Sequence, residues 1–218
     1  AGMHDLATSE AQAMYHHFGN LRTPLLAEQG PAVLMLSVSS YRTTEKDRVI
    51  LDEVAAKWPE APMPPFELAM RAIETSPSEA LELFPQFIQR MKSGDLKPLP
   101  REAGYYPSAL YKYGFLLQSM GELDKAIDVY KQVRDLSPGY AELNLNLAIL
   151  LAQKSDKETT GPLKLQLLQD ALPYAEAQEK LDYRGRAALK AGEMRQRLRS
   201  IIYRTKQELK TTGTATAP

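Results

Sequence analysis

The chain has 218 residues, of which 44% are apolar and 25% are charged. This composition excludes an intrinsically disordered chain and is typical of a globular protein with a sizeable core. The 27 basic and 27 acidic side chains cancel, so net charge gives no reason to expect nucleic acid or a membrane surface as the partner. The absence of cysteine excludes disulfides, thiolate catalysis and thiolate metal sites.

Residues 1–30 are predicted to form an N-terminal helical segment. A signal peptide has a continuous apolar stretch after a basic start, and residues 1–20 have no such stretch. The longest apolar run, at 32–36, is too short to span a bilayer. We therefore expect a soluble protein, and the sequence does not decide between the cytoplasm and the periplasm.

Residues 31–92 are predicted to form two degenerate helical hairpins, 31–41 with 44–58 and 65–75 with 77–91. In the last of these helices, apolar side chains recur at helical spacing, and a proline stands at the first helical position. Residues 93–106 are predicted to form a linker, because Gly94 favours a helix stop and prolines follow it.

The middle of the chain has the clearest pattern, which predicts helices over 107–120, 122–136 and 139–154. The second of these is amphipathic and needs a neighbouring helix to cover its apolar side. Leucines lie on more than one face of the third, so we expect that helix to be internal. The motif Ser137-Pro138 ends the second helix, because the residue before proline avoids the helical conformation.

Small, aromatic and proline residues recur in this region at fixed intervals. Counted from Pro107 as position 1, positions 4, 7, 8, 11, 20, 24, 27 and 32 are Leu110, Tyr113, Gly114, Leu117, Ala126, Tyr130, Val133 and Pro138. This arrangement resembles the tetratricopeptide repeat, which has a period of about 34 residues. In that family the small residues lie where two antiparallel helices cross. An ordinary helical hairpin in a bundle is the alternative interpretation.

The resemblance implies an all-α fold, a right-handed superhelical array of antiparallel helix hairpins. Residues 107–183 would hold the repeats, with the second beginning at Ala141 and interrupted by a polar loop at 155–162. A longer helix is predicted over 163–182, with a kink at Pro173. A basic capping helix over 184–210 and a disordered tail over 211–218 would follow.

No group of residues in the sequence predicts a reaction. The histidines, His4, His16 and His17, accompany no metal-binding motif, and adjacent histidines point to different sides of a helix. Phosphate-binding loops, nucleophile elbows and calcium-binding loops are also missing from the sequence. We therefore predict a protein that is not an enzyme and that holds no cofactor and no metal.

The resemblance implies a partner-binding groove instead. In the family, the first helices of successive repeats line a concave surface, and fixed positions on them contact a peptide. In this chain the implied partner-binding residues are Tyr111, Lys112, Phe115, Gln118, Glu142, Asn146, Ile149 and Gln153. We expect Tyr111 and Phe115 to anchor a protein or peptide segment, which makes the chain an interaction scaffold. The alternative is that these two aromatic side chains pack against a preceding helix.

The predicted last helix suggests a second function. Residues 184–210 contain nine basic and two acidic side chains, a net charge of +7, while the rest of the chain carries −7. Anion binding, to nucleic acid or an acidic membrane, would use Arg195, Arg197, Arg199 and Arg204. A solvated capping helix is the simpler explanation, and self-association into a homo-oligomer through the acidic body of another copy is a third. The sequence favours a protein partner over nucleic acid or a membrane.

Overall fold

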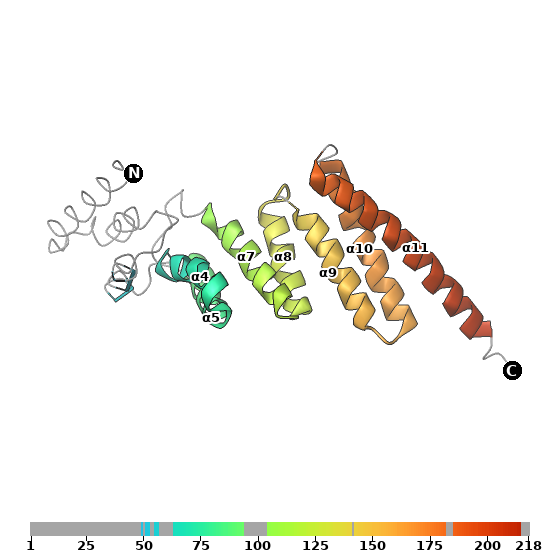
Figure 1. The fold of residues 1–218 in the computed structure, drawn as a ribbon, viewed down its shortest axis with the longest axis horizontal. Helices are drawn as coiled ribbons and strands as arrows, with labels where there is room; N and C mark the ends of the chain where they lie inside the picture. The colour runs from blue at the N-terminus through green and yellow to red at the C-terminus, as the bar shows by residue number, and fades with distance from the viewer. Residues whose placement is uncertain are drawn as a thin grey trace. The chain divides into compact units, whose positions relative to one another are not determined.

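The computed structural model describes residues 49, 51–52, 55–56, 63–93, 104–140, 142–181 and 185–214. All regular structure in these ranges is helical (Figure 1). The predicted all-α fold is thereby confirmed for the described part of the chain. The predicted helical segment at 1–30 and helix at 31–41 lie outside it. The helices are α4 (Met63–Thr75), α5 (Pro77–Ser93), α7 (Tyr105–Ser119), α8 (Leu123–Leu136), α9 (Leu143–Lys157), α10 (Gly161–Leu181) and α11 (Arg186–Thr214).

The chain divides into two compact units, residues 1–109 and 110–218, and the boundary falls inside α7. In the first unit, α4 and α5 pack together as the hairpin that the sequence predicts for 65–91. Phe84 and Phe87 on α5 are fully buried, and the Phe87 ring lies 5.0 Å from that of Phe66 on α4. This aromatic contact fills the space between the two helices.

Helix α7 begins two residues before the predicted position, at Tyr105. The Tyr105 ring stacks on Phe66 with centroids 5.4 Å apart, and the Tyr106 ring lies 6.3 Å from that of Phe87. These contacts hold the first turn of α7 in the aromatic core of the first unit. They also explain why the helix reaches into the segment predicted as a linker. The division into domains given by the sequence otherwise stays a prediction.

In the second unit, α7 packs closely on α8. A Cβ atom added to Gly114 would lie 2.6 Å from Cε1 of Tyr130, closer than real Cβ atoms approach other atoms. The Tyr130 side chain is fully buried, as is that of Ala126 one turn earlier on α8. Gly114 therefore provides the space in which the Tyr130 ring lies. This is the role that the repeat pattern assigns to the three residues.

The turn between α7 and α8 is built around Gly121. Its φ of 79° is in the left-handed region, which glycine adopts without a steric penalty. The amide of Gly121 donates to the carbonyl of Gln118, and the amide of Glu122 donates to that of Leu117. These two hydrogen bonds form a Schellman motif, which satisfies carbonyls at the end of α7. The chain then reverses directly into α8.

Helix α9 begins at Leu143, four residues later than the sequence predicts. The amide of Tyr140 donates to the carbonyl of Ser137 in a turn, and Glu142 has a left-handed φ of 59°. A residue in that conformation cannot continue a helix, so the predicted start at 139 is wrong. The helix itself is internal as predicted, because five leucines on several of its sides are buried: Leu143, Leu145, Leu147, Leu150 and Leu151.

The second helices of successive repeats, α8 and α10, lie in contact. Arg134 of α8 donates a hydrogen bond of 2.9 Å to the hydroxyl of Tyr174 on α10, and its guanidinium lies 5.3 Å from the centre of that ring. The two residues are 40 positions apart, more than one repeat length because a polar loop precedes α10. Helix α10 runs without interruption through Pro173. Stacked hairpins with this pairing form a tetratricopeptide-like array (Figure 1).

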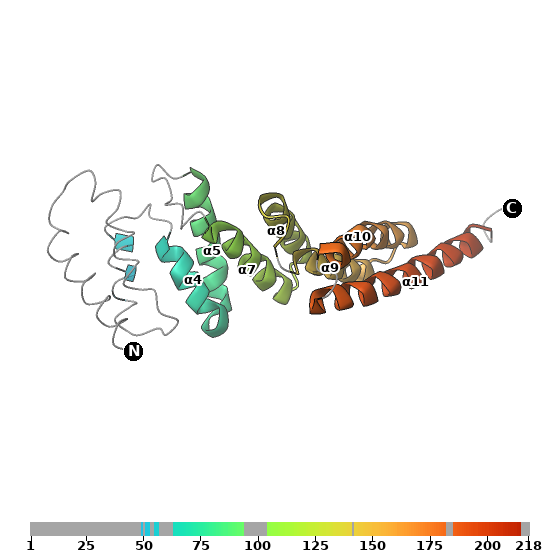
Figure 2. The same cartoon turned by 90° about the horizontal axis from the view of Figure 1, so that it is seen from above.

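Helix α11 packs along α10 and also contacts α9, as the first helix of a further repeat would (Figure 2). The predicted apolar face is confirmed, with Leu198 and Ile202 buried and Met194 and Leu209 half-buried. The helix continues to Thr214, four residues beyond the predicted end at 210. The hydroxyls of Thr211 and Thr212 donate to carbonyls of the preceding turn, which satisfies these side chains within the helix.

The close approach at Gly114 yields a stability test. In Gly114→Ala the new methyl group collides with the buried Tyr130 ring, which cannot move aside. We expect a net destabilisation of about 1–2 kcal/mol, although alanine raises helix propensity by up to about 1 kcal/mol. Urea denaturation measures the change. Gly139→Ala is the matched control, because a Cβ there meets nothing within 4 Å, and an equal loss in both variants would contradict the close packing.

Candidate partner-binding surfaces

The side of α7 predicted to face a partner is the side that remains accessible. From residue 110 onward, Phe115 and Ser119 are exposed, and Tyr111, Lys112 and Gln118 are half-buried. The opposite side of the helix faces inward, since Leu110, Gly114, Leu116 and Leu117 are buried. The periodicity of burial is that of a helix with one face packed on a neighbour.

Helix α9 presents a similar accessible side. Gln153 is exposed, and Glu142, Asn146 and Ile149 are half-buried. Leu145, at a position that contacts ligands in the resembled family, is buried instead and belongs to the core. We use the name first-helix face for the accessible residues of α7 and α9, namely Tyr111, Lys112, Phe115, Gln118, Glu142, Asn146, Ile149 and Gln153.

One hydrogen bond joins the two helices of the first-helix face. The side-chain amide of Asn146 donates to the hydroxyl of Tyr111 over 2.8 Å, and the two residues are 35 positions apart. Separation by one repeat length is expected when equivalent helices of successive repeats lie side by side. The bond therefore places α7 and α9 as adjacent first helices, the arrangement that the predicted groove requires.

Tyr111 is also part of a cluster of tyrosines. Its ring lies 4.7 Å from that of Tyr140 and 5.4 Å from that of Tyr130. Burial raises the pKa of the Tyr111 hydroxyl, the hydrogen bond from Asn146 lowers it, and the charge of Glu142 raises it again. Tyr111 is thus held by its neighbours on three sides. Its ring packs within the second unit, on the rings of Tyr130 and Tyr140.

Phe115 differs from Tyr111, because its side chain is 52% exposed. It lies one turn after Tyr111 on the same face of α7. Burying a phenylalanine side chain in an interface contributes more binding free energy than burying the polar side chains around it. Of the two aromatic anchors predicted from the sequence, Phe115 is therefore the one with surface to offer to a partner.

The four arginines predicted for anion binding divide into two pairs. Arg195 Nη2 donates to Glu179 Oε1 over 3.2 Å, and its Nε lies 2.8 Å from Oε2 in an ion pair that is not aligned as a hydrogen bond. Arg199 donates to Glu176 Oε1 over 2.8 Å. Both therefore serve the contact between α11 and α10. Arg197 and Arg204 are exposed, and neither has an ion pair with any described residue.

Metal clusters and membrane-spanning helices are two further features that the described residues allow to be checked. Within the described ranges there is no group of three or more histidine or acidic side chains that could hold a metal ion. The three histidines of the sequence lie outside those ranges, so their prediction is not tested. None of the described helices combines the length and the apolar character needed to cross a bilayer.

Sequence reasoning missed some of the residues that shape these surfaces. The sequence pattern assigns no role to Tyr140, although its ring lies 4.7 Å from that of Tyr111. The repeat register places it at position 34, the last of the repeat, and this is the signal that could have found it. The pattern of α11 also does not predict the exposure of Leu189 and Tyr203.

Comparisons with known proteins give structural similarity only. No family model matches the sequence, and no curated protein matches it in a sequence comparison. Three solved structures of MamA are similar in part. Two are described as crystal structures of MamA, with TM-scores of 0.43 and 0.44, sequence identities of 12% and 11%, and coverage of 77% and 96% of this chain and 90% and 98% of theirs. The third is a double mutant described as MamA RS-1 ArsTM, with a TM-score of 0.44, 13% identity, and coverage of 84% of this chain and 96% of that one.

Two conservative substitutions in the tyrosine cluster should have opposite effects. The Tyr130 hydroxyl is buried and has no hydrogen-bond partner among the described residues, so Tyr130→Phe should leave stability unchanged or raise it by up to about 1 kcal/mol. Tyr111→Phe removes the acceptor for Asn146 and should lower stability by about 0.5–1.5 kcal/mol. Urea denaturation compares them, and a larger loss for Tyr130→Phe would show that its hydroxyl has a partner.

Alkaline pH provides an independent test of the same burial. Burial raises the pKa of the Tyr130 hydroxyl above its ordinary value of 10.0. The folded state keeps this proton at pH values where the unfolded chain has lost it. The hydroxyl therefore does not change the free energy of unfolding with pH below pH 10, and it lowers that free energy as pH rises further. Between about pH 9 and about pH 11.5, Tyr130→Phe should lose less unfolding free energy than the wild type. Parallel profiles would contradict the burial of the ionisable hydroxyl.

Proposed function

We propose that this protein is an interaction adaptor that binds a segment of a partner protein on the first-helix face of α7 and α9. The observation that carries the proposal is the exposed Phe115 at the centre of an accessible face. That face is held in place by the hydrogen bond between Tyr111 and Asn146. A rigid surface with one uncovered aromatic side chain binds a peptide at low cost in entropy.

The chemistry around Phe115 favours a peptide of mixed polarity. Lys112 and Gln118 lie one turn away from it on α7, and Ile149 and Gln153 lie on α9. Amide side chains can donate to and accept from the backbone of a peptide, while the aromatic and aliphatic groups bury its apolar side chains. The combination suits an extended or helical segment with an apolar residue that packs on Phe115.

Peptide selection with the intact chain tests the proposal. Peptides are selected on the wild-type protein from a random library, and their affinities are measured by fluorescence anisotropy. Phe115→Ala should weaken the selected peptides by about tenfold or more, the usual loss when an aromatic anchor is truncated. Because Phe115 is half exposed, the thermal unfolding temperature of the variant should stay near that of the wild type.

Leu136→Ala is the matched control. Leu136 is 53% exposed, nearly the same fraction as Phe115, but it lies at the end of the second helix α8. Peptide affinity should not change in this variant. If the selected peptides bind Phe115→Ala as tightly as the wild type, the first-helix face is not the binding surface.

A further inference from the structure

Helix α11 has an outer face that no described residue covers. Its inner face packs on α10 and α9 through buried residues that include Ala191, Leu198 and Ile202. On the outer face, Leu189 is 71% exposed and Tyr203 is 66% exposed. Both side chains are therefore available for contact with another surface.

The two apolar side chains share one side of the helix. They are 14 residues apart, which is close to four helical turns and about 20 Å along the axis. Gln196, also exposed, stands halfway between them at the same seven-residue spacing. Residues at i, i+7 and i+14 lie on one side of an α-helix, because seven residues make nearly two turns. We call the exposed residues Leu189, Gln196 and Tyr203 the outer seam.

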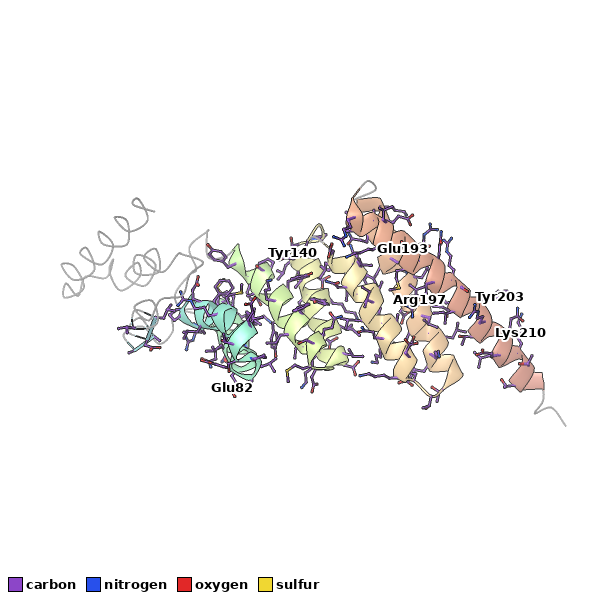
Figure 3. All side chains as sticks on the ribbon, viewed as in Figure 1. Glu82, Tyr140, Glu193, Arg197, Tyr203 and Lys210 are labelled. Carbon is purple, nitrogen blue, oxygen red and sulfur yellow. The ribbon has the colours of Figure 1, made fainter. Side chains whose placement is uncertain are left out.

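Positive charge borders the outer seam along its length. Lys190, Arg197, Arg204 and Lys206 are exposed, and none of them has an ion pair with a described residue. Figure 3 shows Arg197 and Tyr203 on α11, with Glu193 as an acidic residue near the start of the helix. Lys190, Arg197 and Arg204 each follow a residue of the outer seam and so lie on the same side of it, and an incoming surface must supply negative charge along that side.

The inner face of α11 shows what kind of element meets these requirements. There, Arg195 and Arg199, one turn apart, pair with Glu179 and Glu176 of α10, which are also one turn apart. Leu198, which lies between the two arginines in the sequence, is fully buried. An amphipathic helix with spaced glutamates is thus a fitting neighbour for basic residues and a leucine on α11. The outer face repeats the same combination of basic and apolar side chains with no neighbour.

We propose that the outer face of α11 binds an acidic amphipathic helix of a partner protein, with Leu189 and Tyr203 packed against its apolar side. Charge argues for this occupant over a second copy docked through the same face, because two basic faces repel each other. The helical spacing of the outer seam argues for it over nucleic acid, which would gain nothing from an exposed leucine. This surface is separate from the first-helix face.

A designed helix can test the proposal with the full chain. The probe is a fluorescent peptide of about 20 residues, long enough to span the outer seam, with leucine at a and d positions and glutamate on both flanks. The wild-type protein should bind it, and a peptide with lysine in place of every glutamate should not bind. Tyr203→Ser, and separately the double variant Arg197→Glu/Arg204→Glu, should each raise the Kd by about tenfold or more.

Control variants separate this surface from general charge and from the first-helix face. Lys131→Glu changes an exposed lysine on α8 and should alter the Kd by less than about twofold. A change of that size is within the scatter of such titrations and well below the tenfold effect expected for the outer-face variants. Phe115→Ala should also leave binding of the acidic helix unchanged, so failure here and failure of the proposed peptide-binding function are distinguishable. All substituted residues are exposed, and circular dichroism checks that each variant is folded.

Three outcomes would overturn the proposal. The first is equal affinity of the wild type for the acidic and the basic helix. The second is binding of duplex DNA or phosphatidylserine vesicles that is lost in Arg197→Glu/Arg204→Glu, with no binding of the acidic helix. The third is a concentration-dependent dimer in sedimentation that Tyr203→Ser abolishes, again without peptide binding, which would identify a second copy as the occupant.

Discussion

The close approach of Gly114 to the Tyr130 ring is the contact on which the second unit depends. A side chain at 114 would push α7 away from α8, and the ring of Tyr130 would lose the space that it fills. With the ring in place, Tyr111 packs beside it and Tyr140 covers Tyr111. The Tyr111 hydroxyl is then positioned to accept from Asn146, which connects α7 to α9. One missing Cβ atom thus permits a chain of contacts that extends across two repeats.

The charge distribution of the chain acquires a structural meaning once α11 is seen next to α10. A net charge of +7 over 184–210 suggests a uniformly basic helix. The structure instead assigns Arg195 and Arg199 to glutamates of α10, where they fix the position of the helix. Lys190, Arg197, Arg204 and Lys206 are exposed. Ion pairs at partly exposed sites contribute little to stability on their own, so the apolar side with Leu198 and Ile202 holds the helix and the arginines select its register.

Sequence patterns predict the helices and the residues at helix crossings better than they predict the contacts of individual side chains. Gly114, Ala126 and Tyr130 could be assigned because helix crossing demands small residues and a filled gap, and these demands leave a fixed spacing in the sequence. The engagement of Tyr111 by Asn146 and the ion pair of Arg195 could not be assigned in the same way. Periodicity states which face of a helix a residue occupies, whereas its partner comes from another helix 16 or 35 positions away. The left-handed Glu142 was missed because glutamate has no preference for that conformation.

Tyr111 and Asn146 belong to the first-helix face and also join α7 to α9, whereas the other proposed binding residues are separate from those that hold the helices together. Tyr111 and Phe115 are one turn apart on α7, yet the first is enclosed by neighbours and the second is half exposed. Arg195 and Arg197 stand two positions apart on α11, and only the first has a partner on α10. Because a helix turns by about 100° per residue, neighbours in sequence serve different faces. An array of hairpins can therefore change its outward side chains, and with them its partners, while the inward contacts keep the helices in register.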